Sequence, residues 1–170
     1  MAPGPDAAAV AAFTAFYRSS APRLVGFLVW QGARLPDAAE CAQEALTEAF
    51  RQWSSIREPH AWCRRVASRL YARRFAAPEE PVADLDATAG RPLLPAGAGV
   101  DDLHRRHEVL RLLDLLPARQ RQVMAWTYDG ATPAEIADAL RITPEAVRAN
   151  LYKARTTLRN HLHDHGGELP

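Results

Sequence analysis

The chain has 170 residues, 48% of them hydrophobic, and its 21 Lys and Arg against 20 Asp and Glu give a formal net charge of +1 at pH 7. This length permits one ordinary domain or two small ones, and no stretch approaches the roughly 18 consecutive apolar residues that a membrane helix needs. The start, MAPGPDAAAV, lacks a cationic flank followed by a long apolar run, so we expect a soluble, cytoplasmic protein without a secretory signal or membrane insertion.

Charge is distributed unevenly along the chain. Residues 1–77 hold ten Arg against six acids (+4), residues 78–104 one Arg against six acids (−5), and residues 105–163 ten cations against six acids (+4). The last seven residues add two acids (−2), which brings the sum to +1. Because two basic segments are separated by an acidic one, the near-neutral total does not exclude nucleic-acid binding.

The first basic segment is predicted to form four helices. One runs through Phe13 and Phe16, a second begins at Pro22, a third begins at Pro36 and the fourth begins at Pro59. In the third helix, the predicted buried face consists of Ala39, Ala42, Leu46, Ala49, Phe50 and Trp53. Its other side carries acids and amides three and four residues apart, with few cations to balance them: Glu40, Gln43, Glu44, Thr47 and Glu48. Taken alone, such a stripe is typical of a solvated surface.

The fourth helix, PHAWCRRVASRLYARRF, is strongly basic. Its predicted inward face consists of Trp62, Val66 and Leu70, and we expect Trp62 to be a core residue rather than a platform for stacking bases. Five arginines are predicted to point outward: Arg64, Arg65, Arg69, Arg73 and Arg74. Such a density of cations indicates a phosphate-binding surface.

The acidic segment, residues 78–104, is rich in Pro and Gly and has no sustained helical or strand period. It is therefore predicted to be a flexible linker. A coil of this length spans roughly 30 Å root-mean-square, so the segments on either side could bind separate parts of one partner.

The second basic segment begins with a predicted helix over Asp101 to Leu116 that carries a broad face of leucine and valine. Pro117 is expected at the first position of the next helix, which Gly130 can end in a left-handed conformation. The following helix has three start features: Thr132 as cap, Pro133 at the first position and Glu135 completing a capping box.

The last helix begins at Thr143 and Pro144, with Glu145 in its first turn, and follows the preceding one at the short spacing of a helix-turn-helix. Two apolar stripes are predicted to pack on each other, one with Ile136, Ala137 and Leu140 and the other with Val147, Leu151, Ala154 and Leu158. Outside the second stripe lie Arg148, Asn150, Tyr152, Lys153, Arg155 and Arg159. Arg and Asn make bidentate contacts to base edges, while cations also attract phosphates, so this face predicts DNA binding.

The turn between these two helices has Arg141 where such turns usually have glycine. Either Arg141 adopts a positive φ at some energetic cost, or the turn has a different geometry.

In this order, the elements resemble those of extracytoplasmic-function (ECF) sigma factors, the small two-domain initiation factors of bacterial transcription. DAAECAQEAL resembles the family's Asp-x-Ala-Glu-Asp-apolar-apolar-Gln-Glu helix, and AWCRRVASRL its Trp-Leu-x-Arg-Ile-Ala-x-Asn helix. LLDLLPARQRQVM and AEIADALRITPEAVRANLYKARTTL resemble its carboxy-terminal domain. The resemblance covers nearly all of residues 10–162, and it rests on the order and spacing of the motifs rather than on a single one.

The resemblance implies an all-α protein with two small helical domains. A four-helix sigma region-two domain would cover residues 8–77, and a helix-turn-helix region-four domain would cover residues 105–163. A flexible acidic linker, residues 78–104, would join them, and residues 164–170 would form a disordered tail. In such factors the linker threads toward the polymerase channels, where its acids would mimic nucleic acid, although a solvated tether explains the composition almost as well.

The resemblance also implies partners and site residues. Docking on the coiled coil of the largest subunit of RNA polymerase core would use Glu40, Gln43 and Glu44. Recognition and opening of the minus-ten element would use Arg64, Arg65, Arg69, Arg73 and Arg74, with Arg69 and Arg73 standing where the family often has Asn and Asp. Recognition of the minus-thirty-five element would use Thr143, Glu145, Arg148, Asn150, Lys153 and Arg155. The second domain would rest on the flap of the second-largest subunit, and an anti-sigma factor is a further possible partner of a chain that is monomeric when free.

Two other classes of function have less support in the sequence. A helix-turn-helix repressor or activator that acts without polymerase would need a dimerisation helix, and the sequence has no long heptad seam. An enzyme would need a group of catalytic side chains, and the best candidate is the segment HLHDH at residues 161–165. Its histidines could hold a metal ion, but they are expected to be solvated. Cys41 and Cys63 lack metal-ligand spacing and are expected to be free buried thiols. We therefore expect no catalytic activity, no metal and no cofactor.

Overall fold

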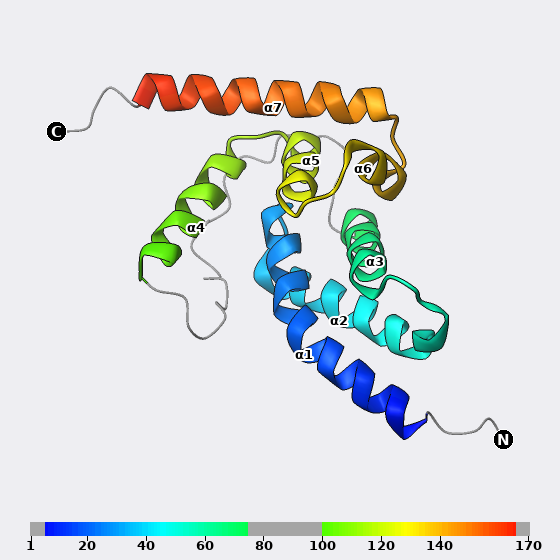
Figure 1. Cartoon of the computed structure of the whole chain (residues 1–170). Helices are drawn as coiled ribbons and strands as arrows, with labels where there is room; N and C mark the ends of the chain where they lie inside the picture. The colour runs from blue at the N-terminus through cyan, green and yellow to red at the C-terminus, as the bar shows by residue number, and fades with distance from the viewer. Residues whose placement is uncertain (1–5, 75–99, 166–170) are drawn as a thin grey trace. The chain divides into compact units, whose positions relative to one another are not determined.

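The computed structural model describes residues 6–74 and 100–165 of the chain. These residues form only helices (Figure 1): α1 (Ala7–Trp30), α2 (Leu35–Arg51), the 3₁₀ helix η1 (Trp53–Ser55), α3 (Pro59–Arg74), α4 (Val100–Asp114), α5 (Ala118–Tyr128), α6 (Pro133–Leu140) and α7 (Pro144–His165). The predicted all-α class is therefore confirmed. The described residues divide into two compact units, one with α1 as far as Val29, α2 and α3, and the other with α4 to α7, and each is described by itself.

Helix α1 corrects the expectation of two separate helices before Pro36, because Pro22 lies inside a single continuous helix. A proline in a helix interior costs about 3 kcal/mol, since it removes one N–H donor and crowds the preceding turn. Buried residues nevertheless lie on both sides of the proline at helical spacing, with Ser20 before it and Leu24, Phe27 and Leu28 after it. We attribute the continuity to this shared buried face, and the first unit consequently has three α-helices instead of four.

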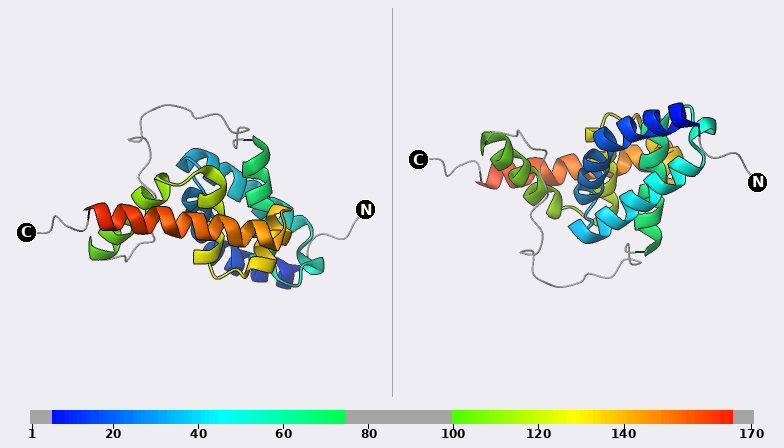
Figure 2. Two further views of the ribbon diagram at one scale, coloured as in Figure 1. Left: turned by 90° about the horizontal axis from the view of Figure 1, so that it is seen from above. Right: turned by 90° about the horizontal axis from the view of Figure 1, so that it is seen from below.

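Helices α2 and α3 pack side by side, as Figure 1 and the two views of Figure 2 show. Their buried faces consist mainly of small residues, which allow close approach: Ala38, Cys41, Ala42, Ala45, Leu46 and Ala49 from α2, and Cys63, Ala67, Ser68 and Leu70 from α3. Two predicted core positions are wrong, because Ala39 is exposed and Phe50 retains 39% of its exposure. Alanines lie along both edges of the α2 stripe, so the hydrophobic pattern alone does not show which edge is covered.

An aromatic cluster joins α1 to the other elements of the first unit. The ring of Phe13 lies 4.8 Å from that of Phe50 and 5.2 Å from that of Trp53, and Phe16 lies 4.8 Å from His60. Such tilted and edge-on pairs add to the stabilisation that burial alone provides. The Tyr17 hydroxyl also donates a hydrogen bond of 3.0 Å to Oε1 of Gln43, which places an α1 group beside the polar stripe of α2.

Helix α4 starts at Val100, so it includes the last residues of the predicted linker; residues 75–99 lie outside the described part of the chain. Leu113 and Leu116 are buried together with Ala154 of α7, and Val109, Met124 and Leu158 pack around them. Helix α7 continues to His165, so the first two residues of the predicted tail are helical, and the remainder falls outside the described residues.

Helices α5, α6 and α7 form the expected helix-turn-helix arrangement. Helix α7 runs past both α5 and α6 (Figures 1 and 2), and its inward residues Val147, Leu151 and Ala154 are buried as predicted. Gly130 has φ 90°, in agreement with the predicted left-handed stop after α5. Pro117 differs slightly from expectation, since its extended backbone makes it the cap of α5 rather than the first helical residue.

Candidate nucleic-acid interface and docking face

Side-chain caps fix the starts of both α6 and α7. The Thr132 N–H donates to Oε2 of Glu135 (2.7 Å), and Oγ1 of Thr132 accepts from the Glu135 N–H (3.3 Å), which completes the predicted capping box. At the start of α7, Oγ1 of Thr143 accepts from the N–H of Ala146 (3.1 Å). Caps of this kind are typically worth about 1 kcal/mol each. The Thr143 cap lies at the turn itself and so helps to set the point at which α7 begins.

Arg141 adopts the left-handed conformation, with φ 55° and ψ 46°, which decides between the two alternatives for this turn. A side chain with a Cβ pays roughly 1–2 kcal/mol for this conformation. The N–H of the next residue, Ile142, donates to the carbonyl of Ala137 (3.1 Å), and Ile136 and Val147 are fully buried on either side of the turn. The turn thus has the geometry that glycine usually provides, with an arginine in its place.

The outward face of α7 presents cations and one aromatic ring. Arg148, Lys153 and Arg155 are exposed, and Tyr152 between them retains 72% of its exposure. Within the described residues, no ion pair holds Lys153 or Arg155, whereas Arg148 is paired at 2.7 Å with Glu145 one turn earlier. Lys153 and Arg155 are therefore available to a phosphate without the loss of an internal contact.

The other residues of the predicted minus-thirty-five set have local partners in this structure. Thr143 is occupied as the helix cap, and Glu145 is paired with Arg148. Asn150 is half-buried, and its amide Nδ2 donates to the backbone carbonyl of Ala146 (2.8 Å), so one of its two N–H donors is used within the helix in this rotamer. Tyr152 was not in the predicted set. Its position could have indicated it, because it is an aromatic residue one turn after Arg148 on a helix face without other apolar residues.

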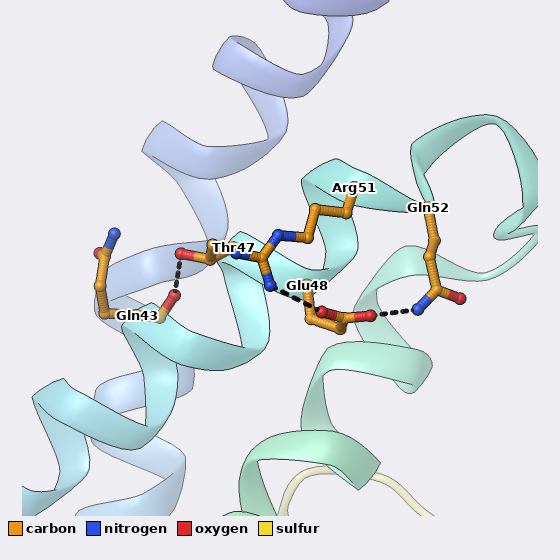
Figure 3. Close-up of polar contacts among 5 residues, drawn as sticks. All are labelled: Gln43, Thr47, Glu48, Arg51 and Gln52. Atoms are coloured by element: carbon orange, nitrogen blue, oxygen red, sulfur yellow. Dashed lines mark hydrogen bonds and ion pairs between the residues drawn. The ribbon is translucent and has the colours of Figure 1, made fainter. Parts of the chain in front are cut away.

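The polar stripe of α2 is exposed as predicted except at Glu48, which is half-buried, and its carboxylates form ion pairs with Arg51 and Arg74. Within the stripe, Oγ1 of Thr47 donates to the carbonyl of Gln43 (2.8 Å), and Arg51 pairs with Glu48 at 3.3 Å (Figure 3). Gln52 also donates to the second oxygen of Glu48. The carboxylate of Glu48 is therefore engaged locally, whereas Glu40 and Glu44 face a different element.

Arg74 at the end of α3 binds both remaining carboxylates. One guanidinium nitrogen lies 3.1 Å from Oε1 of Glu40, and the other lies 2.6 Å from Oε2 of Glu44. The predicted polymerase-docking acids and a predicted DNA-binding arginine are thus in direct contact, which sequence spacing could not show. The side chain of Arg74 is 38% exposed and those of Glu40 and Glu44 are 64% and 44% exposed, so water screens both pairs.

A groove of about 620 Å³ runs between α2 and α3 beside this contact. Its lining comprises Glu40, Gln43, Glu44, Thr47, Glu48 and Arg51 from α2 and Val66, Leu70 and Arg73 from α3. All three predicted docking residues therefore lie on one concave surface. Carboxylates dominate its α2 wall and apolar side chains contribute to its α3 wall, a composition suited to a partner side chain with an aliphatic stem and a cationic end.

The predicted outward position of all five α3 arginines is only partly correct. Arg73 and Arg74 are exposed, whereas Arg64, Arg65 and Arg69 are half-buried, and Nε of Arg69 is enclosed by protein. Trp62 and Val66 are likewise half-buried, while Cys63 and Ala67 form the deepest part of the face. The real inward direction of α3 is therefore rotated from the predicted one, because α2 covers the small residues rather than the large ones.

The two cysteines are free and buried, as expected. Burial raises the pKa of the Cys63 thiol from 9.0 to about 11. The pKa of Cys41 is also raised, by burial above all, while the nearby Arg74 guanidinium acts in the opposite direction. A thiol with a raised pKa is a poor nucleophile, so these side chains serve packing rather than chemistry.

The described ranges, 6–74 and 100–165, contain neither a metal-binding cluster nor a membrane-spanning helix. No group of three or more His, Cys, Asp and Glu side chains there is arranged to hold a metal ion. No helix there is both long enough and apolar enough to cross a membrane.

Comparisons with known proteins place these features in a wider context. Residues 106–158, about a third of the chain, match the family model described as Sigma-70, region 4. The fold is similar to a solved structure described as the co-crystal structure of the sigma factor RpoE in complex with the anti-sigma factor NepR from Bartonella quintana. That match has a TM-score of 0.57 and 18% sequence identity, and it covers 89% of this chain and 96% of the other. No curated protein matches the chain. The family model thus confirms the predicted region 4 domain over residues 106–158, and the structural match shows a similar fold over most of the chain.

Proposed function

We propose that this chain, which carries a sigma-70 region 4 domain in residues 106–158 and has the fold of a sigma factor, is a dissociable initiation factor for bacterial RNA polymerase. It binds the core enzyme, directs it to particular promoters and helps to open the promoter DNA. The observation that carries the proposal is the capped helix-turn-helix with an exposed cationic face inside the matched residues. This function needs no catalytic group, metal or cofactor in the chain itself.

In the proposed complex, α7 lies in the major groove of the minus-thirty-five element. Lys153 and Arg155 bind phosphates, and Arg148 reads a base edge after leaving Glu145. We add Tyr152 to the predicted contacts, because its exposed ring on the same face can pack against a thymine methyl group or a sugar. Thr143 and Glu145 act mainly by fixing the start of α7, given their bonds to Ala146 and Arg148.

The first unit has two tasks in this proposal. The groove between α2 and α3 receives the coiled coil of the largest polymerase subunit through Glu40, Gln43 and Glu44. The basic side of α3, from Arg64 to Arg74, binds the minus-ten strand while bases are held out of the duplex. Unstacking costs a few kcal/mol per base, which contacts to phosphates and flipped bases must offset.

Further partners follow from the same proposal. The flap of the second-largest subunit binds the region 4 domain, and an anti-sigma factor binds the free chain, which is a monomer. The similar RpoE structure contains the anti-sigma factor NepR, which supports this last expectation by analogy.

Transcription in vitro tests the proposal directly. Core RNA polymerase is supplied with the full chain and a library of genomic DNA, and the 5′ ends of the transcripts are sequenced. We expect discrete start sites that share two upstream elements and that vanish when the chain is omitted. The absence of chain-dependent transcripts at any template would overturn the proposal. Tight, sequence-specific binding to duplex DNA without core enzyme would instead favour a repressor or activator that acts independently of polymerase.

A further inference from the structure

Arg74 connects two predicted sites. It is one of the α3 cations assigned to the minus-ten strand, and it binds the α2 carboxylates Glu40 and Glu44 assigned to the polymerase. Arg73, the residue before it, lines the groove between α2 and α3. One guanidinium therefore cannot serve the DNA while it remains between these two carboxylates.

We propose that Arg74 is an internal occupant of the docking face, and that binding of a cationic side chain of the polymerase at Glu40 and Glu44 releases Arg74 to the DNA backbone. This inference rests on the proposed function, since it concerns the regulation of the same docking face. In the free chain, the two ion pairs lower the affinity of the first unit for nucleic acid. In the complex, a cation from the partner takes the place of Arg74 between the carboxylates.

The geometry is suited to such an exchange. The guanidinium uses a separate nitrogen for each carboxylate, at 3.1 Å and 2.6 Å, so both acids are neutralised by one group. Because all three side chains are more than a third exposed, the pairs are screened by water and each contributes little. A partner with a cationic side chain can therefore displace Arg74 without a large penalty, and the α3 backbone need not move, since Arg74 is at the end of the helix.

Direct binding to single-stranded DNA separates this coupling from general charge effects. The full chain is titrated with a fluorescent 20-nucleotide single strand of mixed sequence, without polymerase, over a range of salt concentrations. Glu40→Gln combined with Glu44→Gln frees Arg74 with little change of side-chain shape. The control, Asp37→Asn combined with Glu58→Gln, removes two acids of the same unit that pair with no arginine within the described residues.

We expect the E40Q/E44Q variant to bind the strand about two- to tenfold more tightly than the D37N/E58Q control, in keeping with the small effect of exposed ion pairs. The slope of log affinity against log salt should steepen by about 0.7, the value for one more phosphate contact on a single strand. Adding Arg74→Gln to E40Q/E44Q should abolish the extra affinity for the strand relative to the control. The coupling would be overturned if E40Q/E44Q and the control bound the strand equally well. It would also be overturned if the extra affinity persisted in the presence of Arg74→Gln.

Binding to core RNA polymerase tests the other side of the exchange. Arg74→Gln removes the internal competitor, so this variant should bind core about two- to tenfold more tightly than Arg23→Gln, which removes the same charge from an exposed position of α1 outside the groove. Weaker binding of Arg74→Gln than of Arg23→Gln would overturn the exchange, since Arg74 would then contact the polymerase itself. If the wild-type chain does not bind core at all, the proposed function fails, and the single-strand titration still decides whether Arg74 is held from DNA.

Discussion

Helix α3 in the first unit and α7 in the second both carry a run of cations, but the structure surrounds those cations differently. On α3, Arg64, Arg65 and Arg69 are half-buried and Arg74 is bound by two carboxylates. On α7, Lys153 and Arg155 are exposed on a helix whose other side is firmly packed. The number of positive charges on a helix is thus a poor guide to how many of them can bind phosphate. Each cation binds phosphate only at the free-energy cost of breaking the internal contacts that hold it.

The largest expected effect tests whether α3 stays closed against α2. At pH 8, iodoacetamide should alkylate Cys63 in the native chain about 100-fold more slowly than in urea, because burial raises the pKa of the thiol to about 11 and leaves correspondingly less thiolate. Mass spectrometry of Cys41→Ala, which keeps Cys63 alone, measures the rate. A native rate close to the unfolded one would mean that the α2–α3 interior opens readily.

The same shift predicts a pH dependence of stability. Since the pKa of Cys63 is higher in the folded chain than its ordinary 9.0, the native state favours the protonated thiol. Its contribution to the free energy of unfolding is complete below pH 9 and is lost as the pH rises from about 9 to about 11. Urea titrations of the wild type and of Cys63→Ala across this range should show a shallower decline for the variant.

The next prediction concerns the outward, cationic face of α7. Arg148→Ala should weaken binding of the polymerase complex to its promoter by about 1–3 kcal/mol and relax the base preference at one position. Lys153→Gln should instead weaken binding to all sequences alike and reduce the salt slope by about 0.9. Filter binding on a set of promoter variants measures both, with the exposed Arg23→Gln of α1 as the charge-matched control. If Arg148→Ala leaves the base preference unchanged, Arg148 does not recognise a base.

A smaller effect separates packing from binding on α3. Arg69→Ala should lower the free energy of unfolding by about 1 kcal/mol, because its half-buried stem covers apolar surface, whereas the exposed Arg73→Ala should change it by less than about 0.5 kcal/mol. Arg69→Met should recover the stability but not the charge. Urea unfolding of the full chain gives all three values, and equal losses for Arg69→Ala and Arg73→Ala would contradict the difference in burial.

The smallest effect concerns the turn that orients α7. Arg141→Gly should stabilise the chain by about 0.5–1 kcal/mol, since removing the Cβ relieves the left-handed strain while glycine loses more entropy on folding. Arg141→Ala is the matched control, because it removes the same charge and keeps the Cβ. Thermal unfolding should place the glycine variant above the alanine variant; the reverse order would show that Arg141 makes a contact that outweighs its strain.

Local chemistry explains why the second unit was predicted so well. Thr132, Glu135 and Thr143 act on backbone groups within three residues of themselves, and the stripe of Val147, Leu151 and Ala154 follows from helical spacing. Asn150 stays a predicted base contact, but its amide bonds to its own helix in this structure. A side-chain rotamer depends on the competition between such local bonds and a ligand, which spacing does not reveal.

By itself, the sequence determined the all-helical class, the helix-turn-helix with its caps, the basic α3 and α7 and the acidic stripe of α2, because each depends on residues a few positions apart. Only the tertiary structure decided that α1 continues through Pro22, that the edge of α2 with Ala38 and Cys41 is the one buried, and that Arg74 lies between Glu40 and Glu44. Those three outcomes depend on what packs against a helix from elsewhere in the chain. An arginine 34 positions from its carboxylate is related to it by the α2–α3 contact alone, and no local pattern encodes that distance.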